Sequence, residues 1–86
     1  MKFGYIAYGK MSPELRGSPE DRKKEMDRVK VEAEKHGFEL MYWGHPYGMS
    51  ENIVAVFKSE KTLDAFHSMN IDMPFIDTRT DIVVIP

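Results

Sequence analysis

The sequence predicts an α+β fold in which two helices cover one face of a four-stranded antiparallel sheet. Three observations lead to this prediction. Four short segments are rich in the β-branched and aromatic residues that favour strands, two stretches between them have helical spacing, and a turn-rich segment joins the two middle strands directly. A chain of 86 residues has the size of one small domain, so we expect a single domain over residues 1–86.

The first strand and the first helix have clear start and stop signals. Strand-favouring residues run from Phe3 to Tyr8, and a loop follows. Ser18 is a suitable N-cap for the helix, Pro19 suits its first position, and Gly37 suits the left-handed turn that ends it. One apolar stripe follows the helical spacing of three and four residues: Met26, Val29, Ala33 and His36.

The rest of the chain continues the alternation of strands and helices. We expect a second strand over Phe38–Trp43, a third over Asn52–Lys58, a second helix over Glu60–Met69 with Ser59 as its cap, an irregular segment over 71–77, and a fourth strand over Thr78–Ile85. The inner stripe of the second helix is predicted to be Leu63, Phe66, His67 and Asn70. The order βαββαβ predicts a ferredoxin-like sandwich.

The sheet face away from the helices is predicted to be apolar, although in such a sandwich it should be polar. In the third strand, for example, Ile53 and Phe57 lie on one face, but Val54 and Val56 lie on the other. An apolar face of this extent exceeds what a monomer usually exposes, so we expect a homodimer in which the two sheets pack face to face. The alternative is a mildly apolar surface that stays in water.

Five residues are candidates for a functional site. Trp43 and His45 lie near the central turn, His67 lies on the inner stripe of the second helix, and Tyr5 and Tyr8 lie on opposite faces of the first strand. In an enzyme, His45 or His67 would act as the general acid/base, and a tyrosine such as Tyr8 would orient an enolate or phenolate. The structural alternative places Trp43 in a dimer core, His45 in a turn and His67 at the border of the core.

Other functional classes lack their usual signals. The chain has no cysteine and no histidine spacing typical of zinc sites, so we expect no metal, and it has no glycine-rich phosphate loop, so we expect no cofactor. The net charge of −2 argues against a nucleic-acid partner. No apolar run is long enough to span a membrane, and no signal-peptide pattern is present, so we expect a cytoplasmic protein.

Four short segments resemble a known family. Tyr5–Lys10 resembles a first strand that ends in Gly-Lys, Tyr42-Trp43 resembles a Tyr-Trp pair on the second strand, Ile53–Val56 resembles an apolar third strand, and Thr78–Asp81 resembles the opening of a last strand. Together they resemble the small GYD-domain-type proteins of the dimeric α/β-barrel superfamily. The resemblance implies a dimer whose two sheets form a barrel. Members of that superfamily include cofactor-independent monooxygenases, isomerase-like enzymes, haem-handling proteins and proteins without known activity.

Three functions remain open at this point. The first is binding of a small apolar or aromatic molecule, in a pocket between sheet and helices or inside the barrel, lined by Tyr5, Tyr8, Trp43 and His67, with His45 as a further candidate. The second is an enzyme that acts on an aromatic or enolisable small molecule. The third is a structural or regulatory module without a ligand. An enzyme requires a cavity of roughly 300 Å³ or more that a histidine and a second polar group reach.

Overall fold

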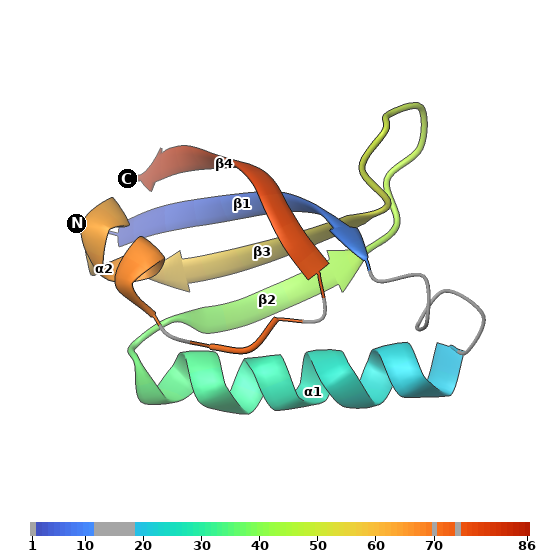
Figure 1. Ribbon diagram of the computed structural model, residues 1–86. Helices are drawn as coiled ribbons and strands as arrows, with labels where there is room; N and C mark the ends of the chain where they lie inside the picture. The colour runs from blue at the N-terminus through green and yellow to red at the C-terminus, as the bar shows by residue number, and fades with distance from the viewer. Residues whose placement is uncertain (1, 12–18, 70, 74) are drawn as a thin grey trace.

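The computed structural model describes residues 2–11, 19–69, 71–73 and 75–86 (Figure 1). Its elements are β1 (Lys2–Met11), α1 (Pro19–Lys35), β2 (Glu39–Gly44), β3 (Ile53–Ser59), α2 (Leu63–Ser68) and β4 (Phe75–Ile85). The four strands form one antiparallel sheet in the order β2-β3-β1-β4. This confirms the predicted α+β fold, and the arrangement is compatible with a ferredoxin-like fold.

The helix α1 confirms the predicted apolar stripe except at its last member. Met26, Val29 and Ala33 are buried, whereas His36 is exposed because the helix ends at Lys35. Gly37 then takes a φ of +84°, a conformation that favours glycine, and the backbone N–H of Phe38 donates to the carbonyl of Ala33 at 2.9 Å. The predicted cap, Ser18, lies outside the described residues.

The core lies between the helices and one face of the sheet, which we call the inner face. An aromatic cluster holds α2 against it: the ring of Phe66 stacks on Tyr5 with centroids 4.8 Å apart and meets the rings of Phe38 and Phe57 edge-on at 5.4 Å. Tyr5, Phe38 and Phe57 are each at most 1% exposed. Phe66 therefore anchors α2, and its loss is expected to cost about 3–5 kcal/mol of stability.

The second helix is shorter than predicted, and Ser59 is not its cap. Ser59 is the last residue of β3, where the alternation of the strand turns its side chain to the inner face. Its hydroxyl donates to the carbonyl of Gly37 at 2.7 Å and accepts from the backbone N–H of Lys61 at 3.0 Å. The helix instead starts after Thr62, which makes no side-chain capping bond. Of the predicted stripe, Phe66 is buried, Leu63 half-buried and His67 exposed, while Asn70 lies outside the described residues.

The fourth strand begins three residues earlier than predicted, at Phe75, because β1 continues to Met11 and pairs with it. Arg79 lies opposite Tyr8 and Asp77 lies opposite Gly9, so Thr78 is an extra residue that forms a bulge in β4. The prediction of irregular structure over 71–77 is therefore wrong for its last three residues.

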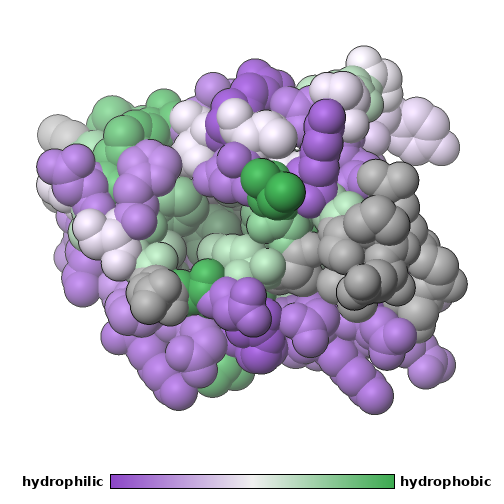
Figure 2. Space-filling view, in the orientation of Figure 1, coloured by the Kyte–Doolittle hydropathy of each residue, from purple (hydrophilic) through white to green (hydrophobic). Residues whose placement is uncertain are grey.

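The helices leave part of the inner face bare. Because α2 has only six residues, the inner side of β4 lacks cover at Ile82 and Val84, which are 43% and 54% exposed. Apolar side chains gather over the C-terminal end of β4 at the upper left of Figure 2. The exposed apolar surface is thus larger than the sequence predicts, because β4 exposes apolar side chains on both of its faces.

Candidate functional site

The structure brings two of the five predicted site residues together, since the rings of Trp43 and His45 meet edge to face with centroids 5.9 Å apart, and it places the other three elsewhere. In the described part of the chain, His67 lines a cavity beside α2, His45 lines another at the β2–β3 connection, and Trp43 lines a third beside α1. Tyr5 lies in the core, and Tyr8 lies on the opposite face of the sheet. Their roles in ligand binding or catalysis stay predictions.

Tyr5 is part of the fold's internal hydrogen bonding. Its side chain is fully buried, and its hydroxyl donates to the backbone carbonyl of Lys61 at 2.5 Å. This burial raises the pKa of Tyr5 above its ordinary value. The hydroxyl thereby ties the central strand to the segment that leads into α2.

A first cavity, which we call the α2 cavity, has a volume of about 210 Å³ and opens between the inner face, α2 and the segment before β4. Figure 2 shows a hollow with apolar side chains near the middle of this side of the molecule. Its lining consists of Ala7, Phe66, His67, Met69, Ile71, Met73, Phe75 and Asp77. Six of these eight side chains are apolar, and His67 and Asp77 supply the polar groups.

Most of this lining is absent from the sequence-based prediction, which includes His67 alone. Four of the missed residues, Ile71, Met73, Phe75 and Asp77, lie in the segment that was predicted to be irregular. A signal for them exists, because apolar residues occupy every second position from Met69 through Ile71 and Met73 to Phe75. Such alternation turns one row of side chains to the same side, here the cavity.

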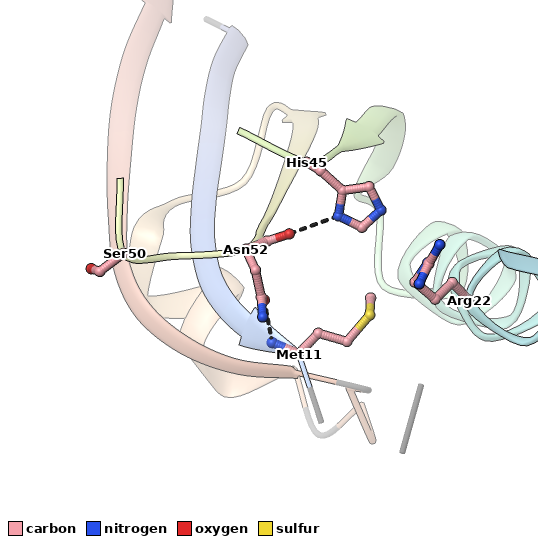
Figure 3. A pocket seen from close by; sticks show the side chains of 5 residues that line it. All are labelled: Met11, Arg22, His45, Ser50 and Asn52. Carbon is pink, nitrogen blue, oxygen red and sulfur yellow. Dashed lines mark hydrogen bonds between the residues drawn. The ribbon is translucent and has the colours of Figure 1, made fainter. Parts of the chain in front are cut away.

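A second cavity, which we call the hairpin cavity, has a volume of about 490 Å³ (Figure 3). It lies where the end of β1, the first turns of α1 and the β2–β3 connection meet. Its lining consists of Met11, Arg22, His45, Ser50 and Asn52. Its volume exceeds the roughly 300 Å³ expected of an enzyme site, and its lining includes a histidine and further polar groups. The α2 cavity is smaller than roughly 300 Å³.

Asn52 organises the hairpin cavity. Its side-chain carbonyl accepts from the backbone N–H of Met11 at 2.6 Å, and its backbone N–H donates to the carbonyl of Gly9 at 3.1 Å. Its own backbone carbonyl lies 2.7 Å from Nδ1 of His45 (Figure 3). The sequence places Asn52 only at the start of a strand, and nothing in its local pattern indicates these long-range bonds.

On the face opposite the helices, which we call the outer face, Tyr8 belongs to a charged cluster. The guanidinium of Arg79 lies over its ring, and Nε of Arg79 is 3.3 Å from Oε1 of Glu51. The Thr78 hydroxyl donates to the carbonyl of Tyr8 at 2.9 Å. A hydrogen bond from Ser50, together with those from the backbone and Thr78 and the charge of Arg79, holds the pKa of Glu51 below its ordinary value.

The centre of the outer face is apolar, as predicted. In β3, Ile53, Ala55 and Phe57 are buried on the inner face, whereas Val54 and Val56 are half-buried on the outer face. The apolar side chains that the strand register places at the centre of the outer face are Ile6, Tyr42, Val54, Val56, Val83 and Ile85, and Ile76 lies on the same face near the start of β4. Charged residues flank them: Glu39 and Lys58 lie opposite each other in the β2–β3 ladder at one end, and Arg79 and Asp81 lie toward the other.

The described residues contain neither a metal-ion cluster nor a membrane-spanning helix. No group of three or more histidine, aspartate or glutamate side chains there is arranged to hold a metal ion. No helix in that part of the chain has the length and apolar character needed to cross a membrane.

Comparison with protein-family models, with curated proteins and with solved structures found no match to this chain. The resemblance to GYD-domain-type proteins therefore rests on the four short segments alone.

Proposed function

We propose that this protein binds a small apolar or aromatic molecule in the α2 cavity and that it works as a homodimer. The observation that carries the proposal is the lining of this cavity, in which six apolar side chains surround about 210 Å³ and only His67 and Asp77 are polar. Small-molecule sites generally combine a mostly apolar wall with a few polar groups that fix the orientation of the ligand.

The volume limits the ligand to about one aromatic ring. An apolar cavity of about 150 Å³ holds benzene, whereas drug-sized ligands occupy about 300 Å³ or more. A single ring with one polar substituent, such as indole or a cresol, therefore fits the volume. The imidazole of His67 and the carboxylate of Asp77 are the groups that would pair with the polar substituent. A cavity of this size favours binding over catalysis at this place.

The outer face supports the proposed homodimer. It has an apolar centre that neither α1 nor α2 covers, and Tyr42 and Val83 on it are 64% and 49% exposed. Each charged edge of this face carries both signs, Glu39 with Lys58 and Arg79 with Asp81. When a two-fold axis packs two such faces together, each edge can pair with opposite charges of the second copy, while the apolar centres exclude water.

Titration with indole tests the ligand-binding part of the proposal. In NMR spectra of protein with ¹³C-labelled methionine methyl groups, the signals of Met69 and Met73 should shift until they saturate. The signal of Met41, which lines another cavity, should not shift. Ala7→Leu, which fills the floor of the cavity, should abolish the shifts, and Ala65→Leu on α2 is the matched control outside the lining. Should Ala7→Leu fail to fold, Met73→Phe is the second filling variant.

The proposal is overturned if indole leaves the Met69 and Met73 methyl groups unchanged at millimolar concentration. It is also overturned if indole shifts Met41 as much as Met73, because such binding is unspecific. A well-folded Ala7→Leu variant that binds indole as tightly as the unaltered protein would also overturn the proposal, because the filled cavity could not be the binding site.

A further inference from the structure

The segment 71–73 forms one wall of the α2 cavity and belongs to no helix or strand. Its apolar side chains, Ile71 and Met73, are half-buried and pack against the core. Within the described part of the chain, one hydrogen bond joins this segment to the rest of the protein: the guanidinium of Arg28 on α1 donates to the carbonyl of Asp72. Apolar packing and this one bond therefore hold the wall in place.

Arg28 is itself held in the position from which it reaches this carbonyl. Its Nε and Nη2 donate to Oε2 of Glu25, three residues earlier on α1, at 3.3 and 2.9 Å. Because Nη2 carries two hydrogens, it can donate to Glu25 and to the carbonyl of Asp72 at the same time. The carboxylate on the next turn, Glu32, pairs with Lys35 instead.

The bond joins two parts of the chain that lie 44 residues apart in sequence. In Figure 1, the segment before β4 runs along α1, so a side chain of α1 can reach its backbone. A hydrogen bond from a charged donor contributes more than one between neutral groups. The side chains of Arg28 and Glu25 are 37% and 38% exposed, and water weakens their ion pair accordingly. We therefore expect an effect of several-fold rather than of orders of magnitude.

We propose that Arg28 is a positioning residue for the α2 cavity, where it fixes the segment 71–73 so that Ile71 and Met73 form an ordered wall before the ligand binds. This inference rests on the proposed binding of a small apolar or aromatic molecule in that cavity. An ordered wall spares the ligand the entropic cost of ordering it, which a loose wall would impose on binding. Arg28, which is not among the residues that line the cavity, thereby raises the affinity indirectly, and Glu25 acts through Arg28.

The test compares Arg28→Gln with the unaltered protein in NMR spectra with labelled methionine methyl groups. Without ligand, the methyl order parameter of Met73 should fall in the variant, whereas that of Met26, which is buried on α1, should not change. Indole should bind about three to ten times more weakly. Lys23→Gln is the matched control, because it removes the same charge from an exposed position of α1 that pairs with Asp27. It should leave the order of Met73 unchanged and alter the affinity less than about twofold.

A double-mutant cycle separates positioning from a general effect on α1. Glu25→Ala should weaken indole binding less than Arg28→Gln does, because the guanidinium keeps its charge but loses its orientation. In the Arg28→Gln background, Glu25→Ala should have no further effect, since the group that it orients is gone. Additive effects of the two substitutions would contradict the proposed role. If Arg28→Gln does not fold, the effect of Glu25→Ala on the order of Met73 and on the affinity is the test.

Two further results would overturn the inference. A methyl group of Met73 that stays equally ordered in Arg28→Gln would show that the bond does not hold the wall. A more mobile Met73 with an unchanged affinity for indole would show that the order of the wall does not set the affinity. If the unaltered protein does not bind indole, the proposed function fails, and the ligand-free order of Met73 still decides whether Arg28 positions the segment 71–73.

Discussion

The guanidinium carbon of Arg79 lies 3.9 Å from the centroid of the Tyr8 ring, directly across the β1–β4 ladder. This cation–π contact covers one end of the outer face, and Glu51 and Asp81 hold the guanidinium from its other sides at 3.3 and 3.9 Å. These charged side chains therefore border the apolar centre of the outer face at this end, and Ile76, which is 74% exposed, lies beyond them. Such a border around an apolar centre is typical of interfaces between protein subunits.

The substitution Val54→Asp should dissociate the proposed dimer. Val54 lies on the outer face next to Tyr8 in the ladder, and a carboxylate there would be buried without a partner when two copies meet. Sedimentation velocity should show a shift to the monomer at concentrations where the unaltered chain is dimeric. The matched control is Val31→Asp, which places the same charge on an exposed position of α1 and should leave the association unchanged. A dimer that survives Val54→Asp would place the interface on another surface.

The substitution Glu51→Gln should change the response of the protein to acid. The folded state lowers the pKa of Glu51 from its ordinary value of 4.5, so its charged form stabilises the fold at neutral pH, and this contribution disappears as the pH falls through the lowered pKa. The Gln variant should therefore be less stable than the unaltered protein at neutral pH, and the difference should vanish in acid. Urea unfolding across this pH range measures it. Glu34→Gln removes the same charge from an exposed position on α1, and it should change the free energy of unfolding at neutral pH by no more than about 0.5 kcal/mol.

The substitution Ser59→Ala should destabilise the protein by about 1–3 kcal/mol, because it leaves the Gly37 carbonyl and the Lys61 N–H without their buried partner. Ser68→Ala removes a hydroxyl of the same kind that donates to the carbonyl of Asp64 at 2.7 Å on the exposed side of α2. Its effect should stay within about 0.5 kcal/mol. Equal losses for the two variants in chemical denaturation would contradict the bridging role of Ser59.

The sequence predicts the element order well because the signals are local. Pro19 and Gly37 bracket α1, and the alternation of Ile53, Ala55 and Phe57 assigns the inner face of β3. The boundaries of β4 and α2 were harder to predict from the sequence, because they depend on contacts between residues that are distant in sequence. Phe75 joins the sheet because Met11 lies opposite it, and Ser59 bridges two segments that are distant in sequence.

The candidate sites were predicted less well for a related reason. A cavity depends on which side chains three or four elements bring together, and sequence spacing does not contain that information. His67 and His45 could be chosen as candidates by their residue type, but the residues that line the same cavities, Asp77 and Arg22, come from other elements. The bulge at Thr78 also changes which residues of β4 share a face, so a strict alternation assigns the first part of this strand to the wrong side.

The central claim is that two helices are too few to cover this sheet and that a second copy covers the outer face. Sedimentation equilibrium of the unaltered chain at micromolar concentration tests this claim most directly. We expect a species of twice the 10.0 kDa chain mass. A single species at the mass of one chain over the whole concentration range would contradict the claim.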